Sequence, residues 1–152
     1  MVIILRGCSG SGKSTAAKAK LQDPDTDKVA VVSADHFFSK SGKYEFDFTK
    51  LGEAHADCMK RFTEAVTSTG DEFTVLVDNT NTSMREVKPY ATKALANGHS
   101  VRIITIVVDP KVAHARNAHE VPFATVEKQS QRLKQSIGTF PDEWNEEVVN
   151  AG

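Results

Sequence analysis

The residues best suited to chemistry in this chain lie between Gly7 and Ser14, which read Gly-Cys-Ser-Gly-Ser-Gly-Lys-Ser. This is the spacing G-x-x-x-x-G-K-[ST], in which glycines let successive backbone N–H groups turn toward an anion. An apolar run precedes the loop at residues 2–5, and residues 15–20 favour a helix, whose start adds the positive end of its dipole. The alternative is a glycine-rich turn without a ligand, and the complete match between a strand and a helix argues against it.

Two side chains of this loop carry distinct chemistry. Lys13 is long enough to reach the outer phosphates of a nucleotide, and the Ser14 hydroxyl is a suitable Mg²⁺ ligand. The loop backbone binds the phosphates as well. The nucleotide-binding residues predicted in the loop are Gly7, Cys8, Ser9, Gly10, Ser11, Gly12, Lys13, Ser14 and Thr15.

Short apolar runs alternate with helix-forming segments along the chain. The expected strands are residues 2–5, 29–32, 73–77 and 101–108, and the expected helices include residues 51–66, 83–97, 110–118 and 123–136. This alternation predicts a three-layer α/β fold with a mostly parallel central sheet of about four strands. The 152 residues are expected to form one domain. The carboxyl ends of parallel strands meet at one edge of the sheet, where ligands bind.

Acidic and amide side chains follow two of the expected strands at that edge. Asp35 comes after the second strand, where a carboxylate could accept the proton of an attacking hydroxyl; the alternative is a helix N-cap. Asp78 ends the third strand, a position from which an acid contacts a metal ion or its waters. Asn79, Thr80 and Asn81 follow, and they could bind phosphate or substrate, or build a turn.

Two arginines and an aromatic residue complete the candidate site. Residues 112–122 are expected to form a lid over the nucleotide. Arg116 in this lid could neutralise charge on the moving phosphoryl group, or could be a solvated arginine at a helix end. Arg132, on the next helix, could line the nucleotide pocket. Phe38 belongs to an aromatic group after Asp35 that could stack on bases or cover the edge of the sheet.

Composition bears on the expected partners and compartment. The 19 basic and 20 acidic residues give a formal charge of −1, so no global field argues for a nucleic-acid or membrane partner. No apolar stretch is long enough to span a membrane, and the first residues lack a signal-peptide pattern. Cys8 and Cys58 show no metal-site or disulfide spacing, which fits a reducing, cytoplasmic compartment.

Four short motifs resemble those of the P-loop kinases grouped around the kinase domain of bacteriophage polynucleotide kinase. They are Gly-Cys-Ser-Gly-Ser-Gly-Lys-Ser (7–14), Ser-Ala-Asp-His-Phe (33–37), Val-Asp-Asn-Thr-Asn (77–81) and Arg-Asn-Ala-His-Glu-Val-Pro (116–122). The resemblance implies a P-loop NTPase fold and transfer of phosphate from ATP, with Mg²⁺, to a hydroxyl group. It casts Lys13 and Ser14 as phosphate and metal contacts. It also casts Asp35 as the general base and Arg116 as a lid arginine.

The chain departs from that family at three places. Asn79 stands directly before the Thr-Asn pair, where the family has its acid, and Asp78 lies one residue earlier, so either residue is open as the metal contact. Phe38 lies near the position at which the family has an arginine that holds the substrate phosphate. His119 and Glu120 stand where the family's lid has a second arginine. These departures leave phosphoryl transfer intact but argue less strongly for a polynucleotide 5′-hydroxyl as the acceptor.

The leading hypothesis is therefore an ATP- and Mg²⁺-dependent kinase whose acceptor is a hydroxyl on a nucleic acid. Both a polynucleotide 5′-hydroxyl and a hydroxymethylated base in DNA, the acceptor of some related phage kinases, fit this hypothesis. The alternatives are a kinase for a small molecule, such as a nucleoside or sugar, and a non-kinase ATPase or switch module. The sequence does not indicate the oligomeric state.

Overall fold

A computed structural model describes residues 1–20, 28–116 and 120–151 of the chain. Its centre is a five-stranded sheet in the order β2-β3-β1-β4-β5, in which every neighbouring pair is parallel. The strands are β1 (Val2–Arg6), β2 (Val29–Val32), β3 (Thr74–Asp78), β4 (Val101–Val107) and β5 (Glu146–Asn150). The helices are α1 (Lys13–Lys20), α2 (Asp35–Phe38), α3 (Leu51–Ser68), α4 (Met84–Ala96), α5 (Pro110–Ala115) and α6 (Phe123–Ser136), with single 3-10 turns η2 (Phe48–Lys50) and η3 (Asp142–Trp144). The predicted α/β fold class is confirmed.

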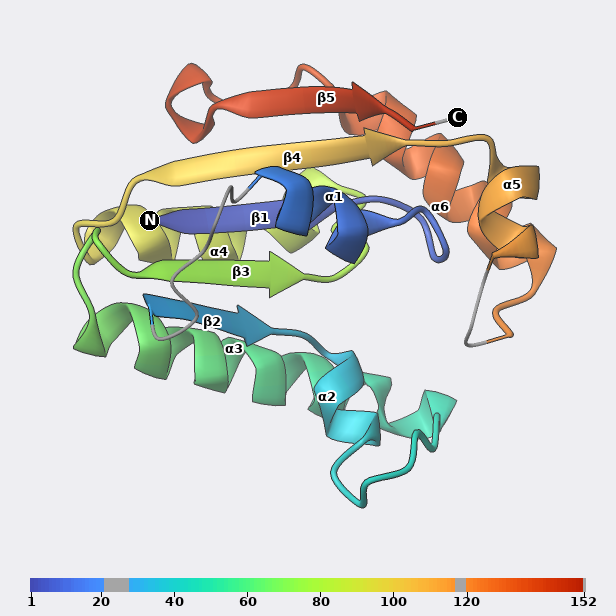
Figure 1. The fold of residues 1–152 in the computed structure, drawn as a ribbon, viewed down its shortest axis with the longest axis horizontal. Coiled ribbons are helices and arrows are strands. Elements are labelled where there is room, and N and C mark those ends of the chain that lie inside the picture. Colours follow the sequence, from blue (N-terminus) through green and yellow to red (C-terminus); the bar gives the residue numbers. More distant parts are fainter. Residues whose placement is uncertain (21–27, 117–119, 152) are drawn as a thin grey trace.

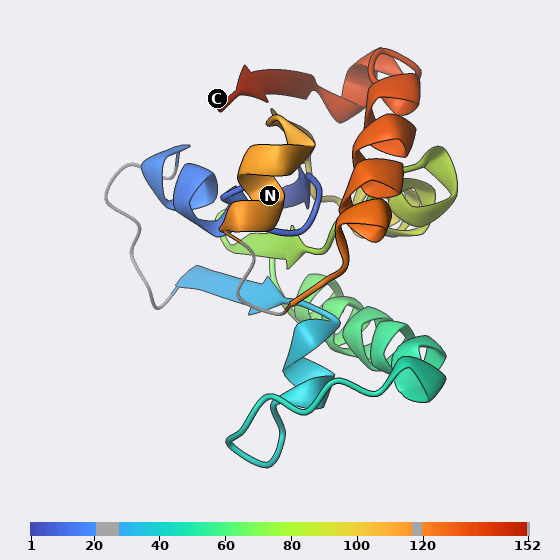
Figure 2. The same ribbon diagram turned by 90° about the vertical axis from the view of Figure 1, so that its right-hand side faces the viewer.

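The inner strands are apolar along their length because helices cover both faces of the sheet. Every residue of β1 is buried, and in β4 only Arg102 and Val107 are partly exposed. Helices α3, α4 and α6 lie on one face and α1 lies on the other (Figures 1 and 2). Continuous apolar strands are typical of parallel sheets covered in this way.

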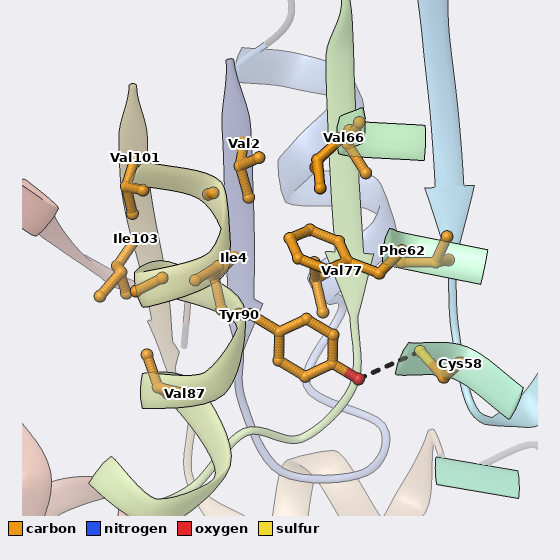
Figure 3. Packing of buried hydrophobic residues seen from close by; sticks show 14 of the residues in the cluster. Val2, Ile4, Cys58, Phe62, Val66, Val77, Val87, Tyr90, Val101 and Ile103 are labelled. Carbon is orange, nitrogen blue, oxygen red and sulfur yellow. Dashed lines mark hydrogen bonds between the residues drawn. The ribbon is translucent and has the colours of Figure 1, made fainter. Parts of the chain in front are cut away.

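The larger part of the core lies between the sheet and helices α3 and α4 (Figure 3). Phe62 of α3 and Tyr90 of α4 meet edge to face, with their ring centroids 4.9 Å apart. The buried Tyr90 hydroxyl donates a hydrogen bond of 3.3 Å to Cys58 Sγ. Cys58 is therefore a packing residue of the core, in agreement with its unremarkable spacing in the sequence.

The fifth strand is the main difference from the predicted elements. The apolar runs predict four strands and none after residues 101–108, whereas β5 pairs with β4, with Glu146 opposite Ile103. An edge strand tolerates polar residues. Both acids of β5 form ion pairs. Glu146 Oε2 lies 2.9 Å from Arg6 Nη1, and Glu147 Oε2 lies 2.7 Å from Arg102 Nη2. These long-range contacts, and not a local apolar pattern, stabilise the strand.

Helix α4 begins and ends where its local signals place it. Ser83 and Glu86 form a capping box at its start. Pro89 lies within its early turns, and Gly98, with a φ of 79°, follows its end. Among the helices of the described residues, none is both long enough and apolar enough to cross a membrane.

Candidate functional site

The loop between β1 and α1 has the backbone that anion binding requires. Gly10 and Gly12 have φ of 81° and 86°, values that favour glycine. A Cβ at Gly7 would lie 2.5 Å from Ser11 Oγ, so a larger residue would collide with the loop. Ser11 Oγ is buried and lacks a hydrogen-bond partner among the described residues. An orphaned hydroxyl in a glycine loop at a helix N-terminus fits a bound phosphate.

Lys13 lies inside this loop. Its Nζ is 3.3 Å from the Gly7 carbonyl oxygen and 3.5 Å from that of Cys8. Burial lowers the pKa of Lys13, while the charges of Asp78, Cys8 and Asp35 act in the opposite direction. The negative charges of both Asp78 and Asp35 therefore favour the charged form of the ammonium group.

Ser14 and Asp78, the two predicted metal contacts, are in direct contact. The Ser14 hydroxyl donates to Asp78 Oδ2 across 2.9 Å. No group of three or more His, Cys, Asp or Glu that could hold a metal occurs in the described part of the chain. One hydroxyl and one carboxylate fit Mg²⁺, which keeps several waters and takes further oxygens from nucleotide phosphates.

Asn79 has a different role from Asp78. Its Oδ1 accepts a 2.9 Å hydrogen bond from the Ala34 N–H, and its Nδ2 lies 3.6 Å from Cys58 Sγ. These bonds tie the end of β3 to the segment just before Asp35. Of the two residues left open by the sequence, Asp78 is the one beside Ser14, and Asn79 positions the neighbouring segment.

Thr80 and Asn81 connect the turn after β3 to β1. The Thr80 carbonyl oxygen accepts a hydrogen bond of 3.0 Å from the Gly7 N–H. Asn81 is buried with a φ of 45°, and its side chain donates to the Leu5 carbonyl oxygen at 2.9 Å. Of the two roles left open by the sequence, these contacts match the building of a turn.

Arg6 is a residue of this region whose importance the sequence analysis missed. Its guanidinium is fully buried, lies 2.9 Å from Glu146 Oε2 and stacks 4.5 Å from the Phe140 ring centroid. It also donates to the carbonyl oxygens of Asn81 and Thr82. Burial lowers the pKa of Arg6 to about 10, and Glu146 opposes that shift. The available signal was an arginine ending an apolar strand directly before the loop.

Asp35 is the first residue of α2, and its side chain is exposed. The N-cap of that helix is Ala34, so the N-cap alternative for Asp35 does not hold. Arg61 of α3 bonds to the chain on both sides of Asp35: it donates to the Ser33 carbonyl oxygen at 2.8 Å and to His36 Nδ1 at 2.9 Å. Arg61 therefore supports the position of Asp35, a role that its place on a polar helix face did not reveal.

Phe38 lies in the hydrophobic core and only 5% of its surface is exposed. Its ring packs edge to face against Phe37, at 5.4 Å, and Tyr44, at 6.2 Å. The aromatic group could either stack on bases or cover the edge of the sheet, and the burial of Phe38 matches the second alternative.

Arg116 lies beside the phosphate-binding loop at the end of α5. A Cβ built on Gly12 would be 4.0 Å from Arg116 Nη1. The predicted lid, residues 112–122, begins in α5, and its residues 117–119, including His119, lie outside the described residues. The described part of the lid thus brings one guanidinium to the loop.

Helix α6 also contacts the loop. Gln129 Oε1 accepts a hydrogen bond of 2.9 Å from the Ser9 N–H, a contact that no sequence motif signalled. Arg132 is exposed and lies almost one turn further along α6.

Comparisons with known proteins agree with this architecture. A family model described as "AAA domain" matches residues 2–137. Human NEDD4-binding protein 2 is 35% identical over 127 residues, which cover 80% of this chain and 7% of that protein. The chain thus spans a small fraction of the length of that relative.

Solved structures share the fold at low sequence identity. A structure of AvrRxo1-ORF1:-ORF2 with ATP contains a chain with a TM-score of 0.72 and 18% identity, covering 99% of this chain and 54% of that one. A chain of the Pnkp1/Rnl/Hen1 RNA repair complex has a TM-score of 0.69 and 20% identity, covering 92% of this chain and 46% of that one. A gluconokinase from Sinorhizobium meliloti 1021 has a TM-score of 0.61 and 17% identity, covering 99% and 82%. From the match over residues 2–137, the chain belongs to the family described as AAA domain.

Proposed function

We propose that this chain is an ATP- and Mg²⁺-dependent kinase that phosphorylates a hydroxyl group on a nucleic acid. The proposal rests on one observation. The groups suited to hold ATP and the carboxylate suited to accept the proton of a hydroxyl group lie at the same edge of the sheet. The Ser14 hydroxyl, in the first turn of α1, lies 2.9 Å from Asp78 Oδ2. The partly buried Lys13 directly precedes Ser14, and the charge of Asp35 acts to raise the pKa of Lys13. Phosphoryl transfer needs these groups close together, because catalysis is mostly positioning and charge stabilisation.

Each residue has a defined task in this proposal. Lys13 and the loop amides hold the terminal phosphates, Ser14 and Asp78 hold the metal ion, and Arg116 stabilises charge on the transferred group. Bound ATP supplies the phosphoryl group, and Mg²⁺ neutralises its oxygens. Asp35 takes the proton from the acceptor hydroxyl as the acceptor oxygen bonds to phosphorus and ADP leaves.

Support for a nucleic-acid acceptor comes from the motif order and from the fold shared with a chain of the RNA repair complex. The fold shared with a gluconokinase favours a second candidate, a small polyhydroxy acceptor. A switch module without an acceptor is the third possibility.

The test is transfer of labelled phosphate from ATP to a panel of acceptors. The panel contains DNA and RNA oligonucleotides with free 5′-hydroxyls, DNA with hydroxymethylated bases, nucleosides and gluconate. We expect transfer to at least one nucleic acid and its loss with Lys13→Ala, which removes phosphate binding. Transfer to nucleosides or gluconate alone would select the second candidate, and ATP binding without any transfer would select the switch module.

A further inference from the structure

The structure assigns a groove beside α2, and we propose that it binds an unpaired base and adjacent phosphate of a single-stranded nucleic acid. Its role as the acceptor site rests on the proposed function. The groove has a volume of about 600 Å³ and is formed by α2 and the segment leading into α3. Its lining includes four phenylalanines, two lysines and two acidic residues.

The aromatic residues of the groove include one that is buried and two that are exposed. Phe38 is buried, and the Phe46 ring packs on it with centroids 5.0 Å apart. Phe46 is nevertheless 53% exposed, and Phe48 is 77% exposed, the largest value among the exposed large hydrophobic residues of the described part of the chain. Leaving two phenyl rings in water is unfavourable unless a ligand covers them. Flat apolar faces of this kind stack on nucleobases regardless of base identity.

Cations stand beside these rings. The Lys40 ammonium lies 4.5 Å from the Phe37 ring centroid and 3.5 Å from Asp57 Oδ1. Lys50 is an exposed residue of the same lining. The acids of the lining partly offset this charge. The Asp47 carboxylate, however, already accepts hydrogen bonds from the Thr49 N–H at 3.0 Å and hydroxyl at 2.6 Å. A ring face next to an ammonium group suits a base joined to a phosphate better than it suits an uncharged sugar.

The groove lies beside the helix that begins with the proposed general base. Its wall, α2, begins at Asp35 and ends one turn later at Phe38. Tyr44 packs on Phe38, and the pKa of Tyr44 is raised by burial and then by the Asp35 charge. Figure 1 shows α2 directly beyond the end of β2, with the following segment extending away from the sheet. A nucleic-acid strand bound in the groove would therefore lie beside the helix whose first residue is Asp35.

Binding of a fluorescein-labelled single-stranded oligonucleotide to the full chain, measured by anisotropy without ATP at fixed salt, tests the groove. We expect Phe48→Ala to weaken binding about tenfold or more, and Phe48→Trp to preserve it, because the indole ring keeps the stacking face. Lys50→Gln should reduce the slope of log affinity against log salt by about 1. Val148→Ala, which shortens an exposed residue of β5, is the matched control and should leave binding unchanged.

The same variants separate failure of the groove from failure of the proposed function. Equal affinity of the wild type and Phe48→Ala for single strands, with both proteins folded by circular dichroism, would overturn the groove. So would an unchanged acceptor KM for Phe48→Ala in an active kinase, and the proposed function would then survive. Loss of binding in Phe48→Ala without transfer to any nucleic acid would uphold the groove and reject the kinase acceptor.

Discussion

The Ser14 hydroxyl donates a 2.9 Å hydrogen bond to the Asp78 carboxylate, which joins the first turn of α1 to the last residue of β3. The two residues are far apart in the sequence, and only the parallel pairing of β1 with β3 brings them together. In that register Leu5 lies opposite Asp78, so the loop that follows β1 starts beside the carboxylate. Two oxygen atoms of the kind that a hard cation prefers therefore lie side by side.

This contact predicts a specific metal dependence. Asp78→Asn removes the anionic ligand, so the Mg²⁺ concentration for half-maximal phosphoryl transfer should rise about tenfold or more. A Mg²⁺ titration of initial rates measures this, and chelation with EDTA should abolish transfer in the wild type. Asp71→Asn, in the turn that precedes β3 and so far from the end of the strand that holds Asp78, is the control. An unchanged Mg²⁺ requirement for Asp78→Asn would remove Asp78 from the metal site.

Asp35 is predicted to act on turnover and not on nucleotide binding. Asp35→Asn keeps the size of the side chain, but the amide cannot take the proton from the hydroxyl group that is phosphorylated. The kcat should therefore fall by a factor of about 10² to 10⁴. The Kd for ATP, measured by calorimetry, should stay within about twofold. Glu53→Gln, an exposed substitution on α3, controls for the lost charge. Parallel losses of kcat and ATP affinity in Asp35→Asn would contradict its role as the base.

Arg116 is predicted to contribute mainly in the transition state. Its guanidinium lies beside the loop near Gly12, so Arg116→Ala should lower kcat about 10²-fold or more with a much smaller change in ATP affinity. Single-turnover rates at saturating ATP measure the effect. Arg102→Ala, which removes an arginine from the distant part of β4, should be nearly neutral. Equal rates for Arg116→Ala and the wild type would make Arg116 a solvated helix-end residue.

The buried pair between Arg6 and Glu146 is predicted to stabilise the fold. Arg6→Met leaves the Glu146 carboxylate without its cation, and the free energy of unfolding should fall by about 3–5 kcal/mol. Arg102→Met breaks a partly exposed pair with Glu147 and should cost at most about 1 kcal/mol.

Urea denaturation of both variants provides the comparison. The combined change Arg6→Met with Glu146→Leu should recover part of the loss, because no buried charge is then unpaired. Similar midpoints for the Arg6 and Arg102 variants would show that the buried pair adds no stability.

Local chemistry accounts for what the sequence alone predicted. The glycines at 10 and 12 adopt positive φ wherever such a loop forms. The apolar runs become parallel strands, and those at the centre of the sheet are largely buried. The loop and the α/β class could therefore be predicted from neighbouring residues. The parallel strands then placed Asp35 and Asp78 at the edge of the sheet that also holds the loop.

Contacts between distant residues decided the rest. Whether Asp78 or Asn79 faces Ser14 depends on how the turn after β3 bonds to β1 and to Ala34. Arg6 became the centre of a buried network only when β5 brought Glu146 to it. Such choices depend on which groups tertiary packing removes from water, and no short stretch of sequence carries that information.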